Sequence, residues 1–274
     1  MDNVRILYIS HEISPYNVSD AGDIVQTLAS KIQGKKKEIR VFMPRFGSIN
    51  ERRFSLHEVQ RLSGNNVEVN DSDHPVVVKV ASLREKKMQV YFIDNDEYFK
   101  RKFVFADKEG NWFDDNDERA IFFAKGVLDA VKRQGWAPDI IHCNGWMSAL
   151  VPMMLKKVLK DDPHYTNAKV VFTAHEGDMD KTINPELIGK LKMEGFVDAD
   201  LEGLQDPSIS NMNLKGLEFA DAIAEGAEGV FESLKVNPEN YDKTVLPFSE
   251  IDGNLVDAYN NMYDTVLAGS EITA

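Results

Sequence analysis

The sequence is poor in several features, and each shortage excludes some classes of function. Of its 274 residues only Cys143 is a cysteine, so no disulfide can form within the chain, which is typical of a reducing compartment. Lysine and arginine number 32 against 45 aspartates and glutamates, giving a formal charge of −13. Nucleic acids and anionic membranes bind basic surfaces, so this balance argues against both as partners.

Long apolar runs are also missing. No segment reaches the roughly 18 apolar residues that a membrane helix needs. Residues 1–10 show no basic run followed by a long apolar core, so they do not resemble a secretion signal. We therefore expect a soluble, cytoplasmic protein. With 43% hydrophobic residues, the chain is long enough for one large or two small α/β domains.

The apolar runs that are present are short, and helical patterns separate them. Four of them predict strands covered on both faces, at residues 4–9, 39–43, 140–144 and 169–173. Residues 20–32 and 117–132 have helical spacing, with Ser19 or Asp20 as the cap of the first helix. Strand, helix and strand in succession form parallel crossovers, so we predict a doubly wound, mainly parallel α/β sheet. Nine strand residues should be buried: Ile6, Leu7, Ile9, Val41, Ile140, Ile141, Val170, Val171 and Phe172.

Two further regions have their own patterns. Residues 52–94 are rich in β-formers between turn-like segments, which predicts an inserted antiparallel meander. Later segments predict helices near 185–191, 212–219 and 227–234, a strand at 221–224 and a linker at 238–247. A terminal amphipathic helix is indicated by the stripe Ile251, Leu255, Tyr259, Met262 and Val266. We divide the chain into a domain of residues 1–246 and a helix of residues 247–274 that packs back on it.

Polar side chains follow two of the predicted strands. His142 and Asn144 end one strand, and His175 and Glu176 follow another. Ligands of open parallel sheets bind in the crevice outside the carboxyl ends of the strands, so these residues are candidate ligand contacts. The two histidines could form an acid/base pair or be hydrogen-bonded core residues.

Trp146 begins the helix after the first of these strands, either as a platform for a sugar ring or as part of the core. Cys143 is expected to be a small buried residue and not a nucleophile. No histidine or carboxylate spacing indicates a metal site, and neither G-x-S-x-G nor a Ser-His-Asp pattern is present.

The loop after the first strand reads SHEISPYNVSDAG. A loop that leads into a helix N-terminus can cradle phosphates through its backbone N–H groups. Asp20 and Gly22, at the end of this loop, are candidate ligand contacts. This loop is poor in glycine and contains no lysine, so it fits neither a Rossmann dinucleotide motif nor a P-loop. The alternative is a surface loop capped by Asp20.

Several motifs, in order and spacing, resemble the N-terminal domain of bacterial glycogen synthases and plant starch synthases. They are YISHEISPYNVSDAGDIVQTL, IRVFMPRFGSI, VYFIDNDEYFKR, DNDERAIFFAKGVLDAV, GWAPDIIHCNGWMSAL and VVFTAHE. The resemblance implies one Rossmann-like half of a GT-B glycosyltransferase, in which two such domains face each other across a cleft. It also implies retaining transfer of glucose, without metal or cofactor, from a sugar nucleotide to the non-reducing end of an α-1,4-glucan.

The sequence departs from this family at functional positions. The family's K-x-G-G-L, whose lysine meets the donor phosphates, is replaced by VSDAGD, with Val18 or Ser19 near the lysine position and Asp20 close by. In the family's H-x-H-D-W-H the last histidine lines the reaction centre, and here it is Met147. The family's second domain has no room in residues 177–274.

These departures imply a domain without autonomous activity. It would bind an α-glucan or malto-oligosaccharide but no sugar nucleotide, in a regulatory role or as half of a split enzyme whose partner protein supplies the second domain. The alternative is an active glucosyltransferase that moves glucose from ADP-glucose or UDP-glucose to an α-1,4-glucan. An unrelated nucleotide-binding Rossmann protein is disfavoured by the glycine-poor loop.

Overall fold

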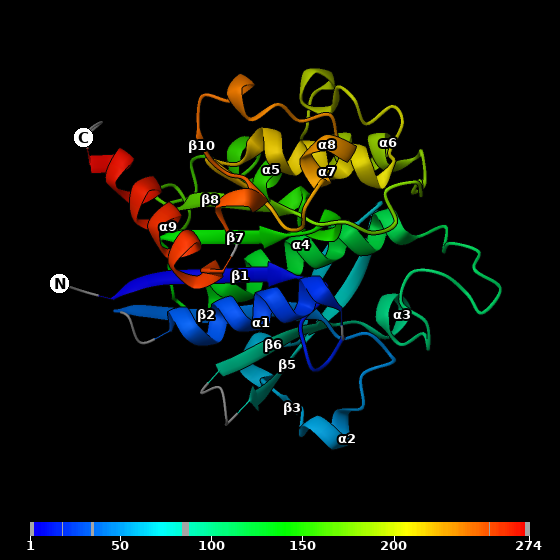
Figure 1. The fold of residues 1–274 in the computed structure, drawn as a ribbon. Helices are drawn as coiled ribbons and strands as arrows, with labels where there is room; N and C mark the ends of the chain where they lie inside the picture. The colour runs from blue at the N-terminus through cyan, green and yellow to red at the C-terminus, as the bar shows by residue number, and fades with distance from the viewer. Residues whose placement is uncertain (1–2, 18, 34–35, 84–87, 252, 272–274) are drawn as a thin grey trace.

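The computed structural model describes residues 3–17, 19–33, 36–83, 88–251 and 253–271. A ten-stranded sheet crosses it in the order β10-β9-β8-β7-β1-β2-β6-β5-β3, with β4 paired to β5 (Figure 1). The strands are β1 Val4–Ser10, β2 Lys37–Pro44, β3 His57–Glu58, β4 Asn65–Val69, β5 Ser72–Leu83, β6 Met88–Asp94, β7 Ile140–Asn144, β8 Lys169–Ala174, β9 Ala222–Glu225 and β10 Thr244–Leu246. All neighbours from β10 to β6 are parallel, which confirms the predicted doubly wound α/β class.

Helices cover both faces of the sheet. They are α1 Asp20–Ile32, α2 Glu51–Phe54, α3 Asp96–Phe99, α4 Asn116–Arg133, α5 Leu150–Lys157, α6 Leu187–Met193, α7 Ile209–Phe219, α8 Val230–Ser233 and α9 Leu255–Glu271. Figure 1 shows α1 and α9 together on one face and α4 and α5 on the other. α1 joins β1 to β2 and α5 joins β7 to β8, and these two steps run in opposite directions along the sheet, so right-handed crossovers place α1 and α5 on opposite faces. No helix of the described ranges is long and apolar enough to cross a bilayer.

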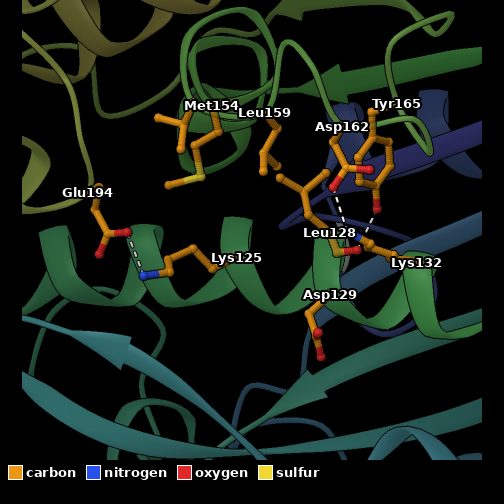
Figure 2. Close-up of a pocket in the computed structure, with 10 residues that line it drawn as sticks. Lys125, Leu128, Asp129, Lys132, Met154, Leu159, Asp162, Tyr165 and Glu194 are labelled. Carbon is orange, nitrogen blue, oxygen red and sulfur yellow. Dashed lines mark hydrogen bonds and ion pairs between the residues drawn. The ribbon is translucent and has the colours of Figure 1, made fainter.

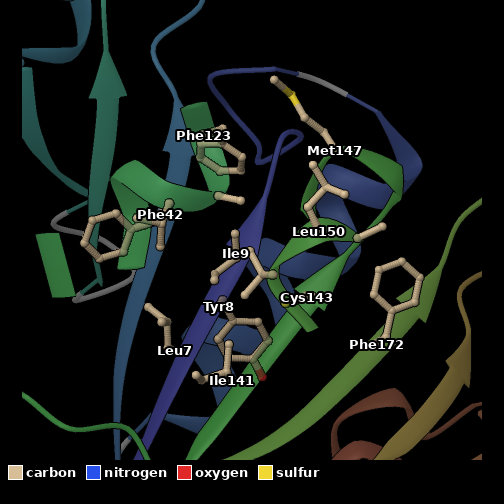
Figure 3. Close-up of a cluster of buried hydrophobic side chains, with 14 of the residues drawn as sticks. Leu7, Tyr8, Ile9, Phe42, Phe123, Ile141, Cys143, Met147, Leu150 and Phe172 are labelled. Atoms are coloured by element: carbon tan, nitrogen blue, oxygen red, sulfur yellow. The ribbon is translucent and has the colours of Figure 1, made fainter. Parts of the chain in front are cut away.

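The core lies along the central strands, where β1 is flanked by β2 and β7 (Figure 3). All nine strand residues predicted to be buried are at most 1% exposed, in adjacent parallel strands. Met147 and Cys143 are fully buried in the same cluster. The apolar runs therefore predicted these strands and their burial correctly.

The meander differs from the prediction at one strand. β5 pairs antiparallel with β3, β4 and β6, as expected, but β6 also pairs parallel with β2. Residues 88–94 are therefore part of the main sheet as well as of the meander. β6 pairs with both strands because a strand has two hydrogen-bonding edges, one of which faces β2 and the other β5.

The sequence predicted a linker at residues 238–247, and this prediction is wrong for the end of the segment. Its last residues form β10, which pairs parallel with β9 through Val245 and Ile223. The proline and asparagines at residues 237–240 are typical of turns, and they made the segment look like a linker although a strand of three residues follows them. The terminal helix is present as α9, but it begins at Leu255, so Ile251 of the predicted stripe lies before the helix, at the end of a 3-10 turn. Ile251, Tyr259, Met262 and Val266 are at most 7% exposed and Leu255 packs against the core.

Candidate functional site

The parallel strands all end at one edge of the sheet, and a hollow of about 630 Å³ opens there. We call it the carboxyl-end hollow. It is lined by Glu12, Ser19, Asp20, Ala21, Ile24, His175, Glu176, Gly177, Gly226, Ala227 and Phe248. A smaller pocket of about 40 Å³ shares Glu12, His175, Glu176 and Gly177 with it and adds His11, Gly145, Trp146 and Asp178. The loop after β1 and the ends of β7 and β8 thus bring the predicted residues Asp20, Trp146, His175 and Glu176 to one region.

The hollow is acidic. Glu12, Asp20 and Glu176 line it, and no lysine or arginine is among its lining residues. The first turn of α1 carries both Asp20 and Asp23, which offset the positive end of the helix dipole. Phosphate-binding sites usually present cationic side chains to the phosphate. A phosphate at this helix N-terminus would instead lie next to carboxylates. The chemistry of the hollow therefore fits a neutral ligand with hydroxyl groups better than an anion.

Close packing explains why residue 22 is a glycine. A Cβ at this position would lie 2.8 Å from the backbone oxygen of Asn17, so only glycine lets the loop close against α1. Ser19, one of the two predicted caps, accepts a hydrogen bond from the Gly22 backbone N–H at 2.9 Å. Asp20 is exposed beside it. Val18, the other residue near the family's lysine position, lies outside the described residues.

His175 and Asn144 are in contact. The His175 Nε2 atom lies 3.3 Å from Oδ1 of Asn144, and both side chains are at least 93% buried. Burial, and to a lesser degree the neighbouring His11, lowers the pKa of His175 to about 3. The imidazole is therefore neutral at physiological pH and can exchange hydrogen bonds with hydroxyl groups at the hollow.

His142 lies elsewhere, beneath α9. Its Nδ1 atom is 2.7 Å from the Tyr263 hydroxyl and its Nε2 atom is 2.7 Å from Oγ1 of Thr173. It is fully buried, which lowers its pKa to about 3. Both ring nitrogens are thus engaged inside the protein, and the structure does not bring His142 to the hollow.

Trp146 belongs mainly to an aromatic cluster. It is 3% exposed, with ring centroids 5.0 Å from Phe105, 6.1 Å from Trp112 and 5.9 Å from His11. Its ring faces are covered by these neighbours, so it offers little surface on which a sugar could stack. Phe105 and Trp112, stacked on each other at 5.7 Å, are only half-buried.

Sequence reasoning missed His11 and Glu12. His11 directly follows β1, so the same strand-end argument that selected His175 would have selected it. It is 7% exposed, its Nδ1 atom has no hydrogen-bond partner among the described residues, and burial lowers its pKa. Gly145 admits the ring, because a Cβ there would lie 2.8 Å from His11 Cε1.

Neither metal nor thiol chemistry is indicated. In the ranges that the structure covers, no three histidine, cysteine, aspartate or glutamate side chains converge as metal ligands would. Cys143 is buried in β7, and burial raises the pKa of its thiol. Its sulfur therefore stays protonated and away from solvent.

A third pocket, of about 240 Å³, lies between α4 and α5 (Figure 2). Its apolar lining includes Leu128 and Met154. Two pairs of its charged groups meet across the rim, Lys125 with Glu194 at 2.5 Å and Lys132 with Asp162 at 2.6 Å, and Asp129 is paired with Arg133 at 2.7 Å. Because these charges neutralise each other, this pocket lacks the free polar groups of the carboxyl-end hollow.

Known proteins resemble this chain over most of its length. The family described as "Starch synthase catalytic domain" matches residues 5–226. The glycogen synthase of Chlorobium luteolum is 36% identical over 225 residues, which cover 81% of this chain and 45% of the relative. That of Chlorobium phaeobacteroides is 34% identical over 241 residues, covering 86% and 48%. The chain thus spans about half the length of the curated relatives it matches.

A solved structure has the same fold. It is the catalytic domain of starch synthase IV from Arabidopsis thaliana bound to ADP and acarbose, with a TM-score of 0.65 at 17% identity. The match covers 81% of this chain and 45% of that structure.

Proposed function

The chain belongs to the family of starch synthase catalytic domains, and on that basis we propose that its carboxyl-end hollow binds a neutral α-glucan and not a sugar nucleotide. It is a glycogen/starch synthase-like glycosyltransferase domain with the α/β fold of one GT-B half. The further proposal is that this polypeptide alone does not transfer glucose. Its role is to bind malto-oligosaccharide, and a partner protein that supplies a donor-binding domain is needed for transfer.

The charge of the hollow carries this proposal. A sugar nucleotide brings a pyrophosphate with about two negative charges, and such a group needs nearby cations or free helix dipoles. The hollow instead offers Glu12, Asp20 and Glu176. These carboxylates and the neutral His175 suit the hydroxyl groups of a glucan, because each can accept a hydrogen bond from them.

A glucose-transfer assay tests the proposal. Purified protein is incubated with ADP-glucose or UDP-glucose and malto-oligosaccharides, with and without extract of the source cells. We expect no transfer by the protein alone, and transfer with extract that exceeds the extract's own activity if a partner is present. Turnover by the purified protein would contradict the proposal and favour the active glucosyltransferase.

A charge-reversal variant tests the electrostatic argument separately. Asp20→Lys places a cation on the lining of the hollow and should raise the affinity for ADP. Asp23→Lys is the matched control, because it makes the same charge change in the same helical turn without lining the hollow. Equal effects of the two variants would show that only net charge matters.

A further inference from the structure

The carboxyl-end hollow has an apolar part besides its carboxylates. Four of its lining residues have apolar side chains: Ala21, Ile24, Ala227 and Phe248. Phe248 is the largest of them and begins the 3-10 turn Phe248–Glu250, which follows β10. The hollow therefore combines an aromatic ring with hydrogen-bonding groups.

The ring of Phe248 has fewer aromatic neighbours than that of Trp146. Phe248 is half-buried and packs against the core. In the part of the chain that the structure describes, no other aromatic ring stacks on it and no cation lies over it. Trp146, by contrast, is covered by three rings. Phe248 thus offers to the hollow the stacking surface that Trp146 lacks.

A buried carboxylate fixes the backbone of Phe248. Glu225, the last residue of β9, is 8% exposed. One of its oxygens accepts a hydrogen bond from the Phe248 backbone N–H at 2.9 Å, and the other accepts one from the Phe231 backbone N–H at 2.9 Å. Hydrogen bonds to a charged acceptor are stronger than those between neutral groups. The turn that carries Phe248 is therefore held to the end of the central sheet.

The next residue, Gly226, brings this part of the chain close to His175. Its backbone N–H donates to the Ala174 carbonyl at 2.8 Å. A Cβ at position 226 would lie 2.4 Å from Nδ1 of His175, so only glycine lets the chain pass this close to the imidazole. The segment after β9 is thereby held beside His175 and, through Glu225, beside Phe248.

An aromatic ring next to hydrogen-bonding groups matches the surface of a pyranose. The C–H groups on the face of a glucose ring are apolar, while its hydroxyl groups project from the rim. Binding sites for small molecules commonly combine an apolar wall with a few polar groups that fix orientation. We propose that Phe248 is the stacking platform of the hollow, on which one glucose unit of the α-glucan lies. This rests on the proposed function and adds to it the residue that recognises the sugar ring itself.

Titration calorimetry with maltoheptaose tests the proposal in three variants of Phe248. Phe248→Ala should weaken binding by about three- to tenfold, the range expected for the loss of one aromatic contact. Phe248→Leu keeps apolar bulk without a ring face and should weaken binding similarly. Phe248→Trp keeps an aromatic face and should retain the affinity.

Phe219→Ala is the matched control. Phe219, at the end of α7, is also a half-buried phenylalanine packed against the core, but it does not line the hollow. Its variant should bind maltoheptaose as the unaltered protein does. As a second readout, the indole introduced by Phe248→Trp should change its fluorescence when maltoheptaose is added, beyond the change given by the protein's own three tryptophans.

The outcomes separate this proposal from the proposed function. If the unaltered protein binds maltoheptaose and Phe248→Ala or Phe248→Leu binds it equally well, the stacking platform is disproved while glucan binding stands. Equal losses in Phe248→Ala and Phe219→Ala would also overturn the platform, because the effect would not be specific to the hollow. If the unaltered protein does not bind maltoheptaose, both proposals are wrong.

Discussion

The hydroxyl oxygens of Tyr8 and Tyr263 lie 2.8 Å apart, although 255 residues separate them in the chain. Tyr263 also meets Nδ1 of His142, whose Nε2 reaches Thr173, and Thr173 lies 3.2 Å from the hydroxyl of Tyr259. This buried chain of hydrogen bonds joins β1, β7 and β8 to the terminal helix α9. These hydrogen bonds explain the position of His142 by a structural role, without a role in catalysis.

Tyr263→Phe should lower the free energy of unfolding by about 1–3 kcal/mol, because it leaves buried groups of Tyr8 and His142 without a partner. Chemical denaturation measures this. Asn261→Ala is the control, since it alters an exposed side chain of the same helix and should change stability by about 0.5 kcal/mol or less. Equal losses in the two variants would show that the hydrogen bonds contribute nothing specific.

Removing α9 tests the division of the chain at residue 246, which we propose on the basis of its packing. Deletion of residues 250–274 exposes the faces of Tyr8 and His142 and should lower the melting temperature or cause aggregation. An unchanged melting curve would show that α9 is an appendage.

Stability should fall as the pH falls below about 6.5. The pKa of His142 and of His175 is lowered from 6.5 to about 3, mainly by burial. Between these values the unfolded chain binds protons that the folded protein does not, so each histidine lowers the free energy of unfolding by about 1.4 kcal/mol per pH unit. Above pH 6.5 neither group contributes to the pH dependence.

Denaturation curves from pH 7 to pH 4 measure this slope. His142→Gln removes one of the buried histidines with a lowered pKa and should make the slope shallower, whatever its effect on stability at pH 7. Asn261→Ala removes an exposed side chain that does not titrate and should leave the slope unchanged. A slope in His142→Gln as steep as in the parent protein would mean that His142 is protonated alike in both states.

Gly145→Ala should destabilise the protein by displacing His11. Gly145 has φ of +74°, and a Cβ there would lie 2.8 Å from His11 Cε1. Gly135 is the matched control, because its φ is +63° and a Cβ there meets nothing within 4 Å. The loss of melting temperature should be larger for Gly145→Ala than for Gly135→Ala. The close approach of His11 is disproved if the two losses are the same.

The fold was predictable where the sequence pattern is local. Continuous apolar runs predicted β1, β2, β7 and β8, and Ser19 was one of two predicted caps. β10 was missed because three residues are too short to form a pattern. The parallel pairing of β6 with β2 was missed because pairing is decided by the whole sheet.

The site was predictable only in part, for the same reason. The strand-end rule led to His175 and Glu176, and these line the hollow. It also selected His142, whose surroundings are tyrosines from a helix at the other end of the chain. No local pattern reveals such a contact. Whether the residues at the hollow bind a glucan stays a prediction.

Calorimetric titration of the purified protein with maltoheptaose and, separately, with ADP-glucose tests the central claim most directly. The acidic hollow predicts binding of maltoheptaose that weakens in Glu176→Ala, and no measurable heat of binding with ADP-glucose. Binding of ADP-glucose in the absence of any other protein, with no response to maltoheptaose, would contradict the account.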